Sequence, residues 1–142
     1  RTLSKNSESG RYKELAGKFY VPGDARPLTN AGSSARPDLV HMVHDFEEFV
    51  KGRREAYRVC WERYQWELSQ GVAEEVARDV LPLGTYTSAY LTGNLLGWFT
   101  FLRLRNGSEG HPQFEIVEVA KKVEAIIEEL YPITYKAWKE SR

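Results

Sequence analysis

The sequence of 142 residues has very little cysteine and no long apolar stretch. Cys60 is its only cysteine, so no disulfide can form within the chain. No uninterrupted apolar run approaches the roughly 18 residues that a membrane-spanning helix needs. No signal-peptide pattern is visible after the first residue, Arg1. From these absences we expect a soluble protein of the cytoplasm.

The sequence also lacks net charge, because 20 lysine and arginine residues balance 20 aspartate and glutamate residues. Duplex nucleic acids are bound largely by neutralising phosphates, so a neutral chain without a basic block is a poor candidate for them. A few converging arginines can still hold one small anion. Aromatic residues make up 13% of the chain, which argues against a disordered segment. The length predicts a single domain over residues 1–142.

The spacing of apolar residues predicts a mainly helical chain with short strands. Helices are expected from Pro37 to about Leu68, over 72–80, from Asn94 to about Leu104, over 114–130 and briefly after Pro132. Strands are expected over 17–21 and 85–92, and loops over 1–12, 22–37 and 106–110. Pro37 suits a helix start, Gly71 suits a helix end and Asn94 is a good N-cap.

The opening segment concentrates hydroxyl, amide and guanidinium groups. It contains Arg1, Ser4, Asn6, Ser9, Gly10 and Arg11. Short hydroxyls, free backbone N–H groups and arginine forks suit a phosphate or carboxylate ligand. Composition alone leaves a second interpretation open, which is a solvated loop.

The spacing of these residues, Arg-x-x-Ser-x-Asn-x-x-Ser-x-Arg, resembles the signature of the flavin-dependent thymidylate synthases, the thymidylate synthase complementing protein family. That signature opens Arg-His-Arg, and Arg1 would be its last arginine. The resemblance continues in VAEEVARDVLPL (72–83), YTSAYLTGNLLGWFTFLRLR (86–105) and HPQFEI (111–116). The chain is therefore expected to be the C-terminal part of such an enzyme, without the upstream segment.

The resemblance implies an α+β fold, here mostly helical with short antiparallel strands. It implies FAD-dependent synthesis of dTMP from dUMP, with 5,10-methylenetetrahydrofolate as methylene donor and NADPH as reductant. It also implies a homotetramer whose active sites are shared between subunits. Two alternatives stay open. One is a nucleotide- or flavin-binding module without catalysis, or an inactive fragment of that enzyme, and the other is a helical interaction domain whose arginines are merely solvated.

The same resemblance implies roles for individual residues. The dUMP site would comprise Ser7, Glu8, Ser9, Gly10, Arg11, Arg78 and Arg105. The FAD site would comprise Arg1, Asn94, Leu96, Thr100 and His111. Arg105 would be catalytic, because its fixed positive charge beside uracil favours loss of the N3 proton. The residues alone do not separate Arg105 from Arg103.

Some positions depart from the family pattern. Family members often have an acidic residue where Ser7 stands, an arginine where Leu96 stands and a polar residue such as asparagine where Thr100 stands. Arg78 also fits a surface helix residue in an ion pair, so its role rests on the resemblance.

Other reactive or aromatic side chains have simpler explanations. Cys60 lies on the apolar stripe of the long helix, which favours core packing over catalysis. His41 and His44 suggest no third ligand, so we expect no metal site. The aromatic cluster of the long helix indicates a core or a subunit interface, and it contains Tyr57, Trp61, Tyr64 and Trp66.

Overall fold

The computed structural model describes residues 3–30, 39–40, 45–107 and 112–141. Its contacts divide the chain into two compact units. The first unit contains Leu91–Arg142 with residues 1–5 and 34–37, and the second contains residues 6–33 and 38–90. The single domain expected from the length stays a prediction. No helix in the described ranges is long and apolar enough to cross a membrane.

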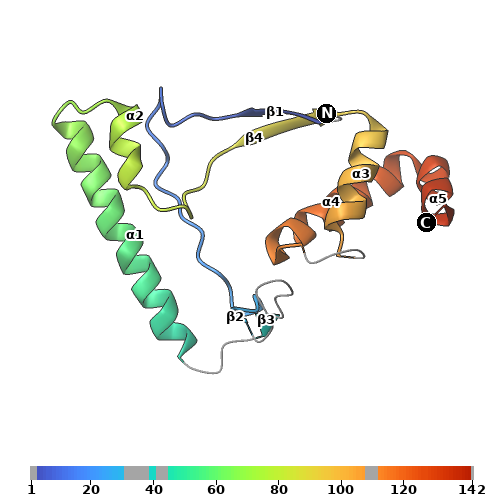
Figure 1. Ribbon diagram of the computed structural model, residues 1–142, viewed down its shortest axis with the longest axis horizontal. Helices are drawn as coiled ribbons and strands as arrows, with labels where there is room; N and C mark the ends of the chain where they lie inside the picture. The colour runs from blue at the N-terminus through green and yellow to red at the C-terminus, as the bar shows by residue number, and fades with distance from the viewer. Residues whose placement is uncertain (1–2, 31–38, 41–44, 108–111, 142) are drawn as a thin grey trace. The chain divides into compact units, whose positions relative to one another are not determined.

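The second unit is built around helix α1 (Phe46–Ser69), the longest helix in Figure 1. Asp45 caps its N-terminus, because the Asp45 carboxylate accepts a hydrogen bond from the Glu48 amide at 2.9 Å. The predicted helix start at Pro37 is wrong. Leu39–Val40 instead forms strand β3, which pairs antiparallel with β2 (Thr29–Asn30). An extended pair replaces the predicted first turns of the helix and part of the predicted loop over 22–37.

Three aromatic residues on one face of α1 hold the chain that follows the opening segment. Tyr57, Trp61 and Tyr64 have i, i+4, i+7 spacing and so share a face. The Leu15 amide donates to the Tyr64 hydroxyl at 3.4 Å, and the Phe19 ring stacks on Tyr57 at 5.1 Å between centroids. Residues 15–19 therefore run along this aromatic row, with Leu15 near one end and Phe19 near the other.

Gly17 sits at the middle of this contact, against Trp61. Its φ of +64° is in the left-handed region. A Cβ placed at Gly17 would lie 2.7 and 2.8 Å from two atoms of the indole ring. Glycine is thus required here both for backbone conformation and for close approach. Tyr64 is fully buried and Tyr57 nearly so, which confirms the core interpretation for these two rings, whereas Trp66 is exposed.

The described strands are short. Strand β1 (Leu3–Ser7) pairs with β4 (Ala89–Gly93), and Figure 1 shows the two side by side. The Glu8 amide donates to the Ser88 carbonyl and the Ser4 hydroxyl to the Thr92 carbonyl, so residue numbers run in opposite directions and the pair is antiparallel.

The predicted strand boundaries need three corrections. The expected loop over 1–12 contains strand β1, and the strand expected over 85–92 forms only at its end, as β4. The strand expected over 17–21 is reduced to one antiparallel bridge between Phe19 and Thr85. In each case a strand forms only where another strand lies beside it. The sequence of the segment alone does not show where such a partner lies.

After α1 the chain forms helix α2 (Glu74–Ala77) and a 3-10 turn, η1 (Arg78–Val80), in place of one helix over 72–80. The first unit contains α3 (Leu95–Arg105), α4 (Phe114–Leu130) and α5 (Pro132–Glu140). The Asn94 side chain accepts from the Gly97 amide at 2.8 Å, so the predicted N-cap of α3 is confirmed. The expected mostly helical α+β fold with short antiparallel strands is confirmed as well.

The core of the first unit joins these three helices. Phe99, Leu102, Ala120 and Ile127 form its buried centre. Trp138 of α5 closes it, because its ring stacks on Phe99 at 4.7 Å with an angle of 10° between the planes.

An ion pair with a third polar partner ties α4 to α5. Glu124 accepts from the Tyr135 hydroxyl at 2.8 Å and pairs with the Lys139 ammonium at 2.8 Å. Partial burial by itself would raise the pKa of Glu124, but the hydrogen bonds from Lys139 and Tyr135 outweigh it and lower that pKa. Glu124 is therefore held ionised between the two helices.

Candidate functional site

A hollow of about 480 Å³ in the second unit brings together segments that are far apart in the sequence. Glu8 and Gly10 line it from the opening segment, and Arg78 lines it from η1. The other walls come from Leu15, Asp79, residues 81–83 and residues 85–87. We call it the Arg78 hollow. Three of the residues predicted to bind dUMP therefore share one concave surface.

The backbone of residues 8–11, here called the signature turn, is fixed by hydrogen bonds. The Glu8 amide donates to the Ser88 carbonyl at 2.8 Å, and the Glu8 carbonyl accepts from the Thr87 hydroxyl at 3.2 Å. The Ser9 hydroxyl accepts from the Arg11 amide at 3.3 Å. Ser9 thus shapes the turn, and no basic side chain contacts its hydroxyl among the described residues. Ser7 lies just before the turn, exposed at the end of β1.

Gly10 is buried in the wall of the hollow. A Cβ placed there would lie 3.0 and 3.2 Å from two carbon atoms of the Leu15 side chain. These distances are tighter than ordinary van der Waals contact, so a larger residue would push the turn away from Leu15. The glycine of the signature therefore allows the turn to lie directly on this side chain.

Arg11 is oriented by its neighbours. Its Nη2 pairs with a carboxylate oxygen of Glu75 at 3.3 Å, and its guanidinium lies 5.2 Å from the centroid of the Tyr12 ring. Arg78 donates from Nε to the main-chain carbonyl of the same Glu75 at 3.3 Å. Two of the three arginines predicted to bind dUMP, Arg11 and Arg78, are thus both anchored on Glu75.

One of the two carboxylates that line the hollow is paired. Glu8 accepts from the Lys13 ammonium at 2.7 Å. This hydrogen bond and the charge of Lys13 lower the pKa of Glu8, and the same contact raises the pKa of Lys13. Lys13 therefore balances the charge of Glu8, and the lining also contains one guanidinium, that of Arg78, and a second carboxylate, that of Asp79.

The remaining predicted residues with a described structure belong to the first unit. Leu96 is 68% exposed in the first turn of α3. The Thr100 hydroxyl donates to the Leu96 carbonyl at 2.9 Å, which is ordinary bonding within a helix. Arg105 is exposed in the last turn of α3, where its Nη1 donates to the Leu104 carbonyl at 3.3 Å.

Several predictions fall outside the described residues. Arg1 and His111, both expected to contact FAD, are among them, and so are His41 and His44. Cys60 is half-buried on α1. Within the described ranges, no three residues of types His, Cys, Asp or Glu come together as a metal site.

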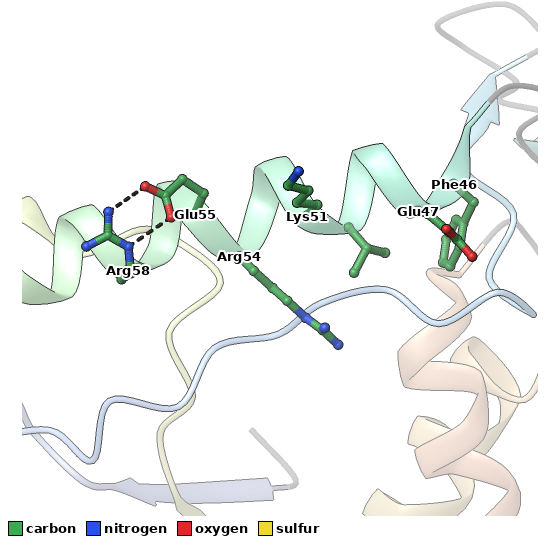
Figure 2. A pocket seen from close by; sticks show the side chains of 7 residues that line it. Phe46, Glu47, Lys51, Arg54, Glu55 and Arg58 are labelled. Atoms are coloured by element: carbon green, nitrogen blue, oxygen red, sulfur yellow. Dashed lines mark hydrogen bonds and ion pairs between the residues drawn. The ribbon is translucent and has the colours of Figure 1, made fainter.

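A second hollow, of about 560 Å³, lies along one face of α1, and Figure 2 shows its lining side chains. Phe46 and Val50 supply the apolar part. Arg58 is held by Glu55, with Nε–Oε2 and Nη2–Oε1 distances of 2.8 and 2.5 Å, and these bonds raise the pKa of Arg58. All lining residues come from one helix, and no element of the opening segment contributes, so this face is not the candidate site.

Sequence reasoning missed Glu75 and Lys13 as parts of the site. From the sequence alone, Glu74 and Glu75 indicate only the acidic first turn of a helix. The spacing of Glu75 and Arg78, three residues apart in VAEEVARDV, could have indicated that they share a helix face. The spacing of Glu8 and Lys13 carries no such indication, because it depends on the course of the turn.

Comparisons with known proteins agree on one family. Residues 1–133 match the family described as Thymidylate synthase complementing protein. A flavin-dependent thymidylate synthase of Streptomyces avermitilis is 42% identical over 142 residues, and one of Streptomyces coelicolor is 40% identical over 141 residues. Both alignments cover 95% of this chain. The chain spans 57% of the length of these relatives.

A solved structure has the same fold. The crystal structure of the UMP/dUMP methylase PolB from Streptomyces cacaoi, bound with 5-Br UMP, matches with a TM-score of 0.89 and 38% identity. The match covers 97% of this chain and 65% of that chain. With the signature turn, the Arg78 hollow and these similarities in agreement, the chain belongs to the thymidylate synthase complementing protein family.

Proposed function

We propose that the protein to which this chain belongs synthesises dTMP from dUMP, with FAD as redox carrier, 5,10-methylenetetrahydrofolate as methylene donor and NADPH as reductant. The observation that carries the proposal is the meeting of Glu8, Gly10 and Arg78 in one hollow. Family membership supports it, and so do the relatives named flavin-dependent thymidylate synthase. The related methylase binds bromo analogues of UMP and dUMP.

In this proposal the Arg78 hollow receives the nucleotide, with the phosphate at Arg78, which lines it, and at Arg11 of the signature turn. Arg78 and Arg11 each present a planar fork of N–H donors that matches phosphate oxygens better than lysine does. Ser7 and Ser9 add hydroxyls near the signature turn, and Gly10 lets its backbone approach the ligand closely. Glu8, whose charge Lys13 balances, presents no free negative charge to repel the phosphate.

Arg105 is proposed as the catalytic residue. Its guanidinium is exposed, and among the described residues it donates only to the carbonyl of Leu104, so four of its five N–H donors are left for a ligand. A fixed positive charge beside uracil stabilises the anion formed when N3 loses its proton. That anion is richer in electrons at C5, the carbon that takes the methylene group.

The described residues of α3 fit a flavin in their chemistry. The Oδ1 atom of Asn94 is used by the helix cap, whereas its amide donors have no acceptor among the described residues. Leu96 offers exposed apolar surface on which a flat ring can pack. We propose that these two residues and Thr100 hold FAD together with Arg1 and His111. When bound, FAD supplies hydride transfer between reductant and nucleotide.

We also propose the homotetramer with shared active sites. Exposed apolar side chains on α4 and α5, among them Ile126, Leu130 and Ile133, support burial against another chain. Light scattering of the purified protein will measure the mass. A monomer at micromolar concentration would contradict this assembly.

The function is tested by the visible absorption spectrum of the purified full-length protein before and after addition of dUMP. Bands of oxidised flavin that shift with dUMP are expected, because the proposed reaction requires the flavin and the nucleotide to meet. dTMP formation is then assayed with 5,10-methylenetetrahydrofolate and NADPH. Absence of flavin, even after soaking in FAD, would contradict the proposal. Saturable dUMP binding without NADPH oxidation would indicate a binding module without catalysis.

A further inference from the structure

Glu75 contacts both arginines of the signature region, each through a different group. Its side-chain carboxylate pairs with Arg11 Nη2 at 3.3 Å, and its main-chain carbonyl accepts from Arg78 Nε at 3.3 Å. Arg11 and Arg78 are 67 positions apart in the chain, counted from their numbers. One residue of α2 thus sets the spacing between two guanidinium groups that come from different segments.

The contacts with Glu75 leave most N–H donors of the Arg11 and Arg78 guanidinium groups available to a ligand. A guanidinium has five N–H donors, and the bond to Glu75 occupies one on Arg11 and one on Arg78. Within the described residues, the main-chain amide of Arg11 is bound to Ser9 and its side chain has no second carboxylate partner. The carboxylate therefore restricts where the Arg11 guanidinium lies without saturating it.

The ion pair contributes little to folding. The side chains of Arg11 and Glu75 are both 51% exposed, and exposed pairs of this kind stabilise proteins only weakly. A flexible arginine loses conformational entropy when it is held for a ligand, and a partner that holds it beforehand removes part of that cost. The pair is better explained by ligand binding than by stability.

We propose that Glu75 is a positioning residue for the phosphate of the nucleotide: its carboxylate holds Arg11 beside Arg78 so that the two forks take the same phosphate group. This inference rests on the proposed function. Glu75 itself does not contact the ligand, because its negative charge would repel a phosphate. Its effect passes through Arg11.

The test compares a ligand with phosphate and one without it. Binding of dUMP and of deoxyuridine is measured by calorimetry on the full-length, FAD-loaded protein and on Glu75→Ala. We expect dUMP to bind about fivefold more weakly to the variant, the upper range for an exposed charge pair. Deoxyuridine should bind both proteins equally. Glu75→Gln, which keeps an oxygen acceptor for Arg11, should restore part of the dUMP affinity.

A double-mutant cycle separates positioning from a general structural effect. In an Arg11→Ala background, Glu75→Ala should have no further effect on dUMP affinity, because the group it positions is gone. Glu74→Ala, a change of the same kind at the adjacent position of α2, serves as the control and should bind dUMP like the wild type. Melting temperatures check that every variant folds.

The outcomes distinguish the possible failures. If the wild type binds dUMP but Glu75→Ala binds it equally well or more tightly, or if deoxyuridine is weakened to the same extent, the positioning role is refuted. The same holds if the Glu75→Ala effect persists without Arg11. If the wild type binds no dUMP at all, the proposed function fails first, and that result is distinct from the others.

Discussion

Substitution of Gly17 by alanine probes the contact that places the signature turn on α1. Two costs are expected. A non-glycine residue at a φ of +64° costs about 1–2 kcal/mol. The new Cβ would lie 2.7 Å from the nearest indole atom of Trp61, and overpacking of this kind costs about 1–3 kcal/mol. We therefore expect Gly17→Ala to lower the free energy of unfolding by about 2–5 kcal/mol.

Gly71→Ala is a matched control, because it has only the first of these costs. Gly71 has a φ of +79°, and a Cβ there would have no neighbour within 4 Å. Its expected cost is about 1–2 kcal/mol. Urea unfolding of the full-length protein measures both variants, and an unchanged slope with denaturant validates the comparison. If both variants lose the same stability, the close contact between Gly17 and Trp61 does not exist as described.

The contact between Gly17 and Trp61 can also be tested by substituting Trp61. The atoms that would clash belong to the outer ring of the indole, Cζ2, Cε2 and Cη2. Phenylalanine lacks this outer ring, so Gly17→Ala should cost less in a Trp61→Phe background than in the wild type. Additive effects of the two substitutions would refute the clash.

Gly17→Ala should also weaken dUMP binding, whereas Gly71→Ala should not, because residues 15–19 fix the exit of the signature turn.

Three further predictions concern charge and packing. Arg78→Ala should lose about 1.5–3 kcal/mol of dUMP binding in calorimetry, a factor of about 10 to 150, while Arg63→Ala, which removes an exposed arginine paired on α1, should lose none. Glu124→Gln should lower the free energy of unfolding by about 1 kcal/mol at pH 7, measured by thermal unfolding. Because the pKa of Glu124 is lowered in the folded state, this contribution is present above the unfolded pKa of about 4.3 and disappears as the pH falls through the folded pKa. An equal loss of stability at pH 2 would contradict the prediction. Leu102→Ala, at a fully buried position, should cost about 2–5 kcal/mol of unfolding free energy, and exposed Leu104→Ala less than about 1 kcal/mol.

The helices were predictable where their ends carry local information. The periodic apolar residues of α4 predicted its bounds at Phe114 and Leu130 correctly, and Asn94 correctly indicated the start of α3. The start of α1 was misplaced, because Pro37 is typical of a helix start, whereas the structure has the N-cap at Asp45. Asp45 and Glu48 have the spacing of a capping box, which was the better indication.

The strands were less predictable, because pairing depends on distant residues. Leu3–Ser7 is rich in polar residues with low strand propensity, and it is extended because β4 lies beside it more than 80 positions later. The converse holds for residues 17–21, whose β-like composition yields a single bridge. The Phe19 ring packs instead against Tyr57 and Trp61 of α1.

The candidate site residues come from the family resemblance, and chemistry alone would not have singled them out. Composition allowed an anion site at residues 1–11, but nothing local connected that segment with Arg78. The structure connects them in one hollow, and the connecting residue, Glu75, was not predicted. A residue that positions two other side chains has no recognisable sequence pattern, since its role depends on where those side chains lie in the fold.

The aromatic row of α1 shows why this site can be built on an irregular segment. Residues 15–19 form only one strand bridge, so their backbone polar groups need other partners. Tyrosine can provide them, because it combines a large apolar ring with a hydroxyl: Tyr64 is buried and still accepts from the Leu15 amide. A leucine at the same position would bury similar area and leave that amide unpaired. The aromatic residues that composition marks as core therefore also hold the segment that leads out of the signature turn.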